Sequence, residues 1–366
     1  MKALICGDIS PTDSNNVLFA QGDVQALFTD TQSLFDRADV SIANLECALT
    51  EHDGAITKKG PPLKGYPATA KTLAKLGLTH CGLANNHFFD FGIQGARDSI
   101  AALAEAGIGV TGFGENLADS RRDLVIERNG EKLCIIAVCE HEYSYATEER
   151  MGCRPFDEFD TPLDIRAAKE QWDRVIVMYH GGKEHCCYPS PRLRKACHAM
   201  AKSGADLILC QHSHCVGTYE QVDGCHILYG QGNFHFVKMA YAKDESWFQC
   251  LAVMYDTATN QVEFIPVTST DGYSIRLANE QEAKAILDGF AQRNLSFADG
   301  SWKDGWHAFC ESMREIYTRV VEKACVPGCE EKDLEQFRHY LDCEAHTDVW
   351  REIFPTWHRN GINHKQ

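Results

Sequence analysis

The sequence lacks any long apolar run and has no excess of basic residues. Its apolar stretches are of strand length, well short of the roughly 20 residues that a membrane-spanning helix needs, so we expect no membrane span. Lys and Arg total 36 against 52 Asp and Glu, which gives a formal net charge of −16. A uniformly acidic protein is poorly suited to bind a nucleic-acid backbone, so we expect no nucleic-acid partner.

The sequence also lacks a CxxC motif, although it contains 17 cysteines. Several of them lie inside apolar runs, such as Cys6, Cys134, Cys139 and Cys210, where a free thiol acts as a small hydrophobic side chain. The odd number and the length of the chain disfavour a disulfide framework. The first apolar run is too short for a secretory signal. We therefore expect a cytoplasmic protein with reduced thiols.

What is present is an alternation of strands and helices over the first 270 or so residues. Helical patterns at 93–106, with Ile93, Ala96, Ile100 and Leu103 on one stripe, and at 191–203 separate some of the apolar runs. Several of these runs are continuously apolar, as in strands buried on both faces, and the pattern indicates an α/β fold. The expected strands are 3–8, 40–46, 80–85, 108–114, 132–140, 174–180, 205–212, 226–234, 249–256 and 261–267.

The last 90 residues are different, because they are helical in period and rich in aromatic side chains. Three helical segments are expected, the third of them over 332–354. We predict a catalytic domain over 1–275 and a helical extension over 276–366. The aromatic side chains must be buried against a partner surface. The extension is expected to dock on its own catalytic domain, and a homodimer interface is the alternative.

Polar side chains follow many of the predicted strands, where an α/β sheet binds its ligands. Asp8, Glu46 and His180 each stand at the end of an apolar run, and Asn85-Asn86-His87 ends another. A fifth run leads into His212-Ser213-His214, and alternate residues of an extended segment can share one face and one metal ion. Imidazole, carboxylate and amide oxygens suit Mn, Fe or Zn. The sequence therefore predicts a metal site at this edge.

The motifs resemble those of the CapA family, named for poly-γ-glutamate capsule biosynthesis, within the calcineurin-like metallophosphoesterase superfamily. The resemblance covers roughly residues 1–240, and GLANNHFFDFG is its most specific element. The motifs that carry it are CGDIS, ANLEC, GLANNHFFDFG, YHGGKE, CQHSHC and YGQGNFHF.

The resemblance implies a four-layer α-β-β-α sandwich of the metallophosphoesterase type, with one or two divalent ions and the C-terminal helices as an appendage. Asp8, Glu46 and His214 would hold the first ion, and Glu46 would bridge to a second held by Asn86, His180 and His212. His87 would act as the general acid beside a water or hydroxide nucleophile on the metals. Asp90 would orient His87 or cap the helix that follows. The expected substrate-binding residues are Asn44, Lys59, Glu184 and Asn233.

The chain also departs from the pattern of the wider superfamily. Ser10 stands where a histidine ligand is usual, and Glu46 replaces a bridging aspartate. Gly181 and Gln211 stand where tryptophan and histidine are common. In the tail, His339 and His346 are seven residues apart in an expected helix. We expect them to be surface or packing residues.

Three functions are consistent with the sequence. The first is a metal-dependent hydrolase of phosphoester type. The second acts on a γ-glutamyl amide or related peptide bond in acidic-polymer metabolism. The third is a non-catalytic accessory role in envelope-polymer synthesis. The expected substrate of either enzyme is a small-molecule or polymer-derived anion.

Overall fold

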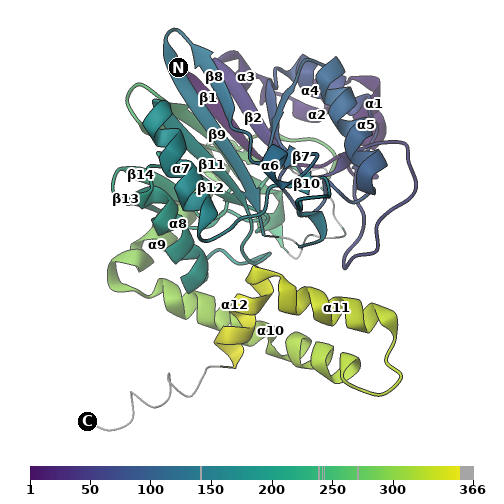
Figure 1. Cartoon of the computed structure of the whole chain (residues 1–366). Coiled ribbons are helices and arrows are strands. Elements are labelled where there is room, and N and C mark those ends of the chain that lie inside the picture. The colour runs from purple at the N-terminus through teal and green to yellow at the C-terminus, as the bar shows by residue number, and fades with distance from the viewer. Residues whose placement is uncertain (141, 238–239, 241, 243, 270–271, 355–366) are drawn as a thin grey trace.

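The computed structural model describes residues 1–140, 142–237, 240, 242, 244–269 and 272–354. Two β-sheets face each other, and helices cover their outer faces (Figure 1). This is the predicted four-layer α-β-β-α arrangement. Among the described helices, none has the length and apolar character to cross a membrane.

The first sheet has the strand order β18-β17-β16-β1-β2-β5-β6, and β15 pairs with the end of β1. β1, β2, β5 and β6 are parallel to one another, whereas the pairs β1–β16, β16–β17 and β17–β18 are antiparallel. Its strands are β1 (Lys2–Ile9), β2 (Val40–Leu45), β5 (His80–Gly82), β6 (Gly109–Thr111), β15 (Asn233–His235), β16 (Gln249–Asp256), β17 (Gln261–Thr268) and β18 (Arg276–Leu277).

The second sheet has the order β13-β14-β12-β11-β9-β8, with antiparallel strands at both edges. Its strands are β8 (Leu124–Arg128), β9 (Glu131–Cys139), β11 (Arg174–His180), β12 (Leu207–Gln211), β13 (Tyr219–Val222) and β14 (Cys225–Leu228). Two small sheets pair β3 (Ala48–Leu49) with β4 (Lys64–Gly65), and β7 (Phe113–Gly114) with β10 (Gly152–Cys153).

The helices of the first domain form the two outer layers. α1, α2, α4 and α5 cover the first sheet, and α7 and α8 cover the second (Figure 1). The helices are α1 (Asn16–Gln21), α2 (Val24–Phe28), α3 (Gln32–Asp36), α4 (Thr69–Leu76), α5 (Gly92–Glu105), α6 (Leu117–Ser120), α7 (Asp160–Gln171) and α8 (Pro191–Lys202), with short 3-10 turns η1 (Glu142–Ser144) and η3 (Glu245–Phe248). α8 begins as predicted, because the Ser190 side chain accepts a hydrogen bond from Leu193 N.

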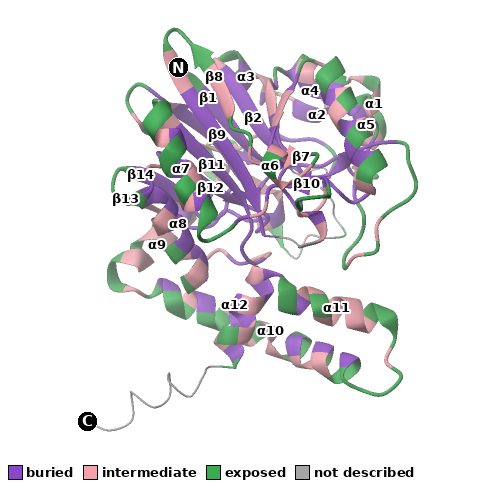
Figure 2. Ribbon diagram, viewed as in Figure 1, coloured by how far each residue is buried: buried purple, intermediate pink, exposed green. Residues whose placement is uncertain are grey.

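The core follows the two-residue period of the strands. Along β9, Ile135 and Ala137 pack between the two sheets, whereas Ile136 and Val138 pack against α7 and α8. Both faces of this strand are buried, which explains its continuously apolar sequence. Figure 2 shows the buried interior of the sheets and the exposed outer faces of the helices. In α5 the predicted stripe is wrong at its first position, since Ile93 is exposed.

Two predicted strands are each divided between different sheets. The run 108–114 breaks at Gly112, whose φ of 81° lies in the left-handed region, and gives β6 and β7. The run 226–234 breaks near Gly232, also at φ 81°, and gives β14 and β15. A Cβ atom at Gly232 would lie 2.2 Å from the carbonyl oxygen of Gln249, so only glycine fits this crossing.

The tail forms α9 (Glu280–Asp299), α10 (Trp302–Ala324), α11 (Glu331–Asp342) and α12 (Glu344–Ile353). The single helix expected over 332–354 is wrong, because Cys343 is extended and divides it into α11 and α12. α9 packs on the first domain through Ile286 and Phe290. In α12, Asp348 accepts hydrogen bonds from Ser190 Oγ and from Arg192 Nε.

The tail therefore lies against the α-β-β-α sandwich of the same chain (Figure 1). Trp306 and Tyr317 are fully buried in a cluster that also includes Cys186 from the loop after β11. The predicted boundary near 275 and the predicted homodimer remain predictions.

Candidate metal centre

Six predicted ligands converge where the carboxyl ends of the strands from both sheets meet. Asp8 is near the end of β1, His180 ends β11, and Glu46 directly follows β2. Asn86 lies in the turn after β5, and His212 and His214 follow β12. Asp8, Glu46 and His180 are completely buried. The strand register pairs Asp8 with Asn44 and His180 with Gln211. Neighbouring parallel strands therefore place polar residues side by side near their carboxyl ends.

The side chains lie at distances that suit shared ions. His180 Nδ1 is 3.8 Å from Asp8 Oδ1, and His214 Nδ1 is 3.7 Å from Asp8 Oδ2. Glu46 Oε1 is 3.5 Å from His180 Nε2 and 3.9 Å from His214 Nε2. Two ligand triads result, Asp8–Glu46–His180 and Glu46–His212–His214, and each has its donor atoms within 4.8 Å of one another. Glu46 belongs to both.

The division of these residues between two ions, as the family pattern implies it, stays a prediction. His180 and His214 lie almost equally close to Asp8, and both also lie near Glu46. Asn86 does lie beside His180, since its Oδ1 is 2.9 Å from His180 Nε2. The shared position of Glu46 agrees with a bridging carboxylate.

The electrostatics favour an ionised Glu46. Burial and the neighbouring Glu46 carboxylate raise the pKa of Asp8 to about 6. Burial also acts to raise the pKa of Glu46, but His214 and His180 outweigh it and lower this pKa to about 2. Glu46 is therefore ionised beside the two imidazoles and away from water.

The residues fit a divalent metal. Among the described residues, neither buried carboxylate oxygen of Glu46 has a hydrogen-bond partner. A buried anion without such partners is costly unless a cation neutralises it. Carboxylate, imidazole and amide donors are the ligand set that Mn, Fe or Zn takes.

The sequence predicts an extended segment for the two histidines after β12, but the structure shows that they do not lie on one. His212 has φ of 80° and His214 has φ of 54°, both in the left-handed region that side chains with a Cβ rarely adopt. Such strain is found where the surrounding structure fixes a functional geometry. Here Asp8 Oδ2 accepts a hydrogen bond from His212 N at 3.1 Å.

His87 lies at the edge of the centre, and Asp90 holds it there. The Nδ1 atom of His87 is 2.7 Å from Asp90 Oδ2. Lys58, whose side chain is only 3% exposed, forms an ion pair with Asp90 and donates to Asn86 O at 2.8 Å. Helix α5 has Phe91 at its N-cap, without a side-chain cap. Of the two predicted roles for Asp90, the structure thus favours orienting His87.

Two residues predicted to bind substrate instead support the ligands. Asn44 donates to Asp8 Oδ1 at 2.8 Å and lies 3.0 Å from His180 Nδ1. Asn233 Oδ1 is 2.9 Å from His214 Nδ1. Both asparagines are buried, so they are placed to orient ligand side chains and not to contact a substrate.

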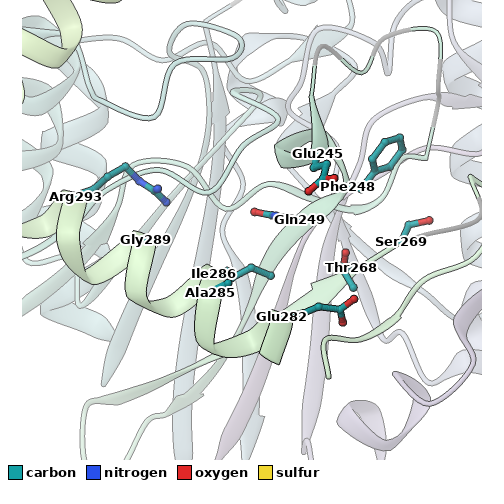
Figure 3. Close-up of a pocket in the computed structure, with 10 residues that line it drawn as sticks. All are labelled: Glu245, Phe248, Gln249, Thr268, Ser269, Glu282, Ala285, Ile286, Gly289 and Arg293. Atoms are coloured by element: carbon teal, nitrogen blue, oxygen red, sulfur yellow. The ribbon is translucent and has the colours of Figure 1, made fainter. Parts of the chain in front are cut away.

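A pocket of about 360 Å³ opens onto the centre. Asn86, His87 and His212 line it, and so do the other two predicted substrate-binding residues, Lys59 and Glu184. The tail closes it with Met313, Ile316, His339, Tyr340 and His346. A larger cavity of about 490 Å³ lies between α9 and the strands β16 and β17 (Figure 3), but no predicted site residue lines it.

Several supporting residues were missed by the sequence analysis. Glu140 follows β9 and accepts hydrogen bonds from Tyr179 Oη and from Gly182 N, which fixes the loop after His180. The rule that selected the other strand-end residues would have found it. Tyr143 and Lys183 also line the pocket. Lys183 lies in the YHGGKE motif next to Glu184, whereas no sequence pattern marks Tyr143.

The α-β-β-α sandwich and the carboxylate–histidine cluster at its strand ends define an α/β protein with a candidate metal centre. The model of the bacterial capsule synthesis protein family PGA_cap matches residues 2–238. The chain belongs to this family, and all six predicted ligands lie within the matched region.

The chain is similar to several curated proteins. It is 27% identical over 252 residues to the PGA biosynthesis protein CapA of Bacillus subtilis, covering 68% of this chain and 64% of that one. It is 29% identical over 222 residues to the capsule biosynthesis protein CapA of Bacillus anthracis, covering 57% and 52%. A probable polyglutamine synthesis accessory protein of Mycobacterium tuberculosis is 30% identical, with coverages of 61% and 62%. The matches thus span less than two thirds of these relatives.

Two solved structures of proteins from Thermus thermophilus also align. A hypothetical protein gives a TM-score of 0.41 at 14% identity, covering 76% of this chain and 99% of its own. The protein TT1561 gives 0.39 at 10% identity, covering 72% and 97%. These values are too low to support a functional comparison.

Proposed function

We propose that this protein is a metal-dependent hydrolase of phosphoester type that acts on an anionic substrate. The observation that carries the proposal is the buried Glu46 carboxylate, shared between two ligand triads and without a hydrogen-bond partner among the described residues. A pocket lined by His87, among other residues, opens onto this centre.

The ion or ions, of the Mn, Fe or Zn type, would be held by Asp8, Glu46, Asn86, His180, His212 and His214. When bound, they supply Lewis-acid charge at the reacting bond and a nucleophile at neutral pH. Asn44 and Asn233 keep the ligand side chains in place through the hydrogen bonds described above.

His87 is the group that donates a proton to the leaving group. Because Asp90 engages Nδ1, the ring nitrogen left for proton transfer is Nε2, and His87 donates from there to the leaving group. Lys59 and Lys183 line the pocket and attract an anionic substrate in an otherwise acidic protein.

A second candidate keeps the centre and changes the bond to a γ-glutamyl amide of an acidic polymer. It is favoured by the family description and by the names of the Bacillus relatives. The pocket lysines suit a carboxylate as well as a phosphate. The Mycobacterium relative is described as an accessory protein, which corresponds to a third, non-catalytic role.

The test combines elemental analysis with hydrolysis assays on aryl phosphates and on γ-glutamyl peptides. The variant His180→Ala should lose the metal of the strand-end centre, and turnover with it. His198→Ala is the matched control, because His198 lies on α8 and pairs with Glu220, and it should keep both. Turnover of the peptides alone would establish the second candidate. Metal binding without turnover of either substrate would refute the hydrolase and leave the accessory role, and a metal-free protein would refute the centre.

A further inference from the structure

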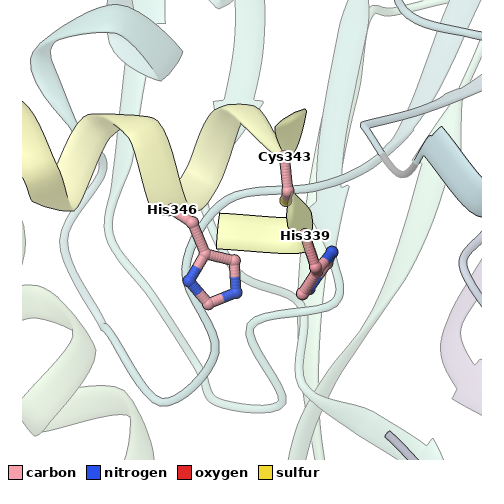
Figure 4. A group of neighbouring side chains, drawn as sticks. All are labelled: His339, Cys343 and His346. Atoms are coloured by element: carbon pink, nitrogen blue, oxygen red, sulfur yellow. The ribbon is translucent and has the colours of Figure 1, made fainter. Parts of the chain in front are cut away.

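A second group of metal-type side chains lies in the tail, outside the region that the family model matches. His339 is in the last turn of α11, Cys343 is at the break between the helices, and His346 is in the first turn of α12. Their donor atoms all lie within 4.8 Å of one another. Figure 4 shows Cys343 between the two imidazole rings. The change of direction at Cys343 brings the three together.

Packing holds both rings in their orientations. The ring of His346 stacks on Tyr340, with centroids 3.9 Å apart, and its Nδ1 is 2.6 Å from Tyr317 Oη. The ring of His339 stacks on Tyr143 with centroids 5.3 Å apart. Metal-bound histidines commonly use their second ring nitrogen in such a hydrogen bond, which orients the ring. With Nδ1 engaged by Tyr317, the nitrogen that an ion would take is Nε2, on the side facing His339 (Figure 4).

The chemistry of the three donors selects a particular class of ion. One thiolate and two imidazoles form a soft-to-borderline set that suits Zn²⁺ in tetrahedral geometry. Bond lengths of about 2.0–2.3 Å require donor separations of about 3.3–3.6 Å. The observed limit of 4.8 Å means that no pair must approach by more than about 1.5 Å. Small side-chain rotations achieve this.

We propose that His339, Cys343 and His346 form a separate thiolate–imidazole site for a zinc-type divalent ion. The ion would fasten α11 to α12. His339 and His346 also line the pocket that Asn86, His87 and His212 share. An ion therefore has an entry path, and the fourth coordination position would be open to water or to an anionic substrate group.

Cobalt substitution tests the site separately from the strand-end centre. The full-length protein is freed of metal with a chelator and titrated with Co²⁺. Thiolate ligation gives a sulfur-to-cobalt charge-transfer absorption in the near ultraviolet, and the strand-end centre contains no cysteine ligand. We expect this absorption to reach the intensity of one thiolate-bound cobalt ion per chain and to disappear when Zn²⁺ is added.

Variants test whether the absorption comes from a cobalt ion bound by the Cys343 thiolate. Cys343→Ala should abolish it, whereas Cys310→Ala, which removes another fully buried thiol from the tail, should keep it. His339→Gln changes a partly exposed residue and should weaken cobalt binding without disturbing the fold, as checked by circular dichroism. Asp8→Asn should leave the absorption unchanged even if the proposed hydrolase fails. A wild-type protein without the absorption, or a Cys343→Ala variant that retains it, would overturn the proposal.

Discussion

Replacing Asp90 with asparagine separates the charge of this residue from its shape. Asp90 is completely buried and has three partners: Lys58 in an ion pair, His87 Nδ1 at 2.7 Å and the Leu63 amide at 2.7 Å. Asparagine has nearly the same size and can still accept from Leu63. It cannot balance the charge of Lys58 or present a carboxylate to His87.

The expected effects on stability and on turnover have different sizes. Lys58 would be left as a buried charge without its counter-ion, which typically costs about 3–5 kcal/mol. If Asp90 acts only by orienting His87, its loss can reduce turnover by no more than the contribution of His87. A positioned general acid contributes roughly 10²–10⁴-fold, or about 2.7–5.4 kcal/mol in the barrier.

The assay compares Asp90→Asn, His87→Gln and the double variant on one substrate with a poor leaving group. The double variant should be no slower than His87→Gln alone, because coupled residues act as one unit. Adding Lys58→Met to Asp90→Asn should recover stability in urea unfolding but not turnover. Losses that multiply in the double variant, or wild-type turnover in Asp90→Asn, would refute the orienting role.

Three further outcomes are expected. His87→Ala should slow substrates with poor leaving groups by roughly 10²–10⁴-fold and affect good leaving groups much less; equal losses on both would exclude the general acid. Asp348→Ala should destabilise the docked tail by roughly 1–3 kcal/mol. The loss is no larger because Arg192 keeps its ion pair with Glu140 when that with Asp348 is removed. Limited proteolysis should then release the tail faster than in wild type. Burial acts to raise the pKa of Glu220, but Arg194 and further donors lower it below 4.5. The ionised Glu220 therefore stabilises the fold above pH 4.5, and this contribution is lost as the pH falls through the lower pKa of the folded state. In urea unfolding at pH 3–7, Glu220→Gln should make the free energy of unfolding less dependent on pH in the acidic part of this range. An unchanged pH dependence would contradict this.

The convergence of the candidate ligands at the strand ends could be predicted because their positions follow from a local pattern. Apolar runs mark the strands, and parallel strands bring their carboxyl ends to one edge. Asp8, Glu46 and His180 required no more than this. The role of Asn44 could not be predicted, because whether an asparagine faces a substrate or a neighbouring ligand depends on contacts between separate strands.

The break between α11 and α12 could not be predicted, for a different reason. No glycine or proline marks a break at Cys343, so helical periodicity predicts one uninterrupted helix over 332–354. The break follows from the docking of α12 on α8 through Asp348 and Arg192, a tertiary contact that helix periodicity does not reveal. The ion pair of Lys58 with Asp90 is another such tertiary contact, which no local pattern marks.

The most direct test of the metal centre is a crystal structure of the full chain grown with Mn²⁺ and measured for anomalous scattering. The account predicts an anomalous peak bound by the Glu46 carboxylate, with oxygen and nitrogen ligands at about 2.0–2.2 Å from the cluster. Histidine ligands from β11 and from the turn after β12 should surround it. A structure in which these side chains keep the described arrangement and no anomalous peak lies among them would contradict the central claim.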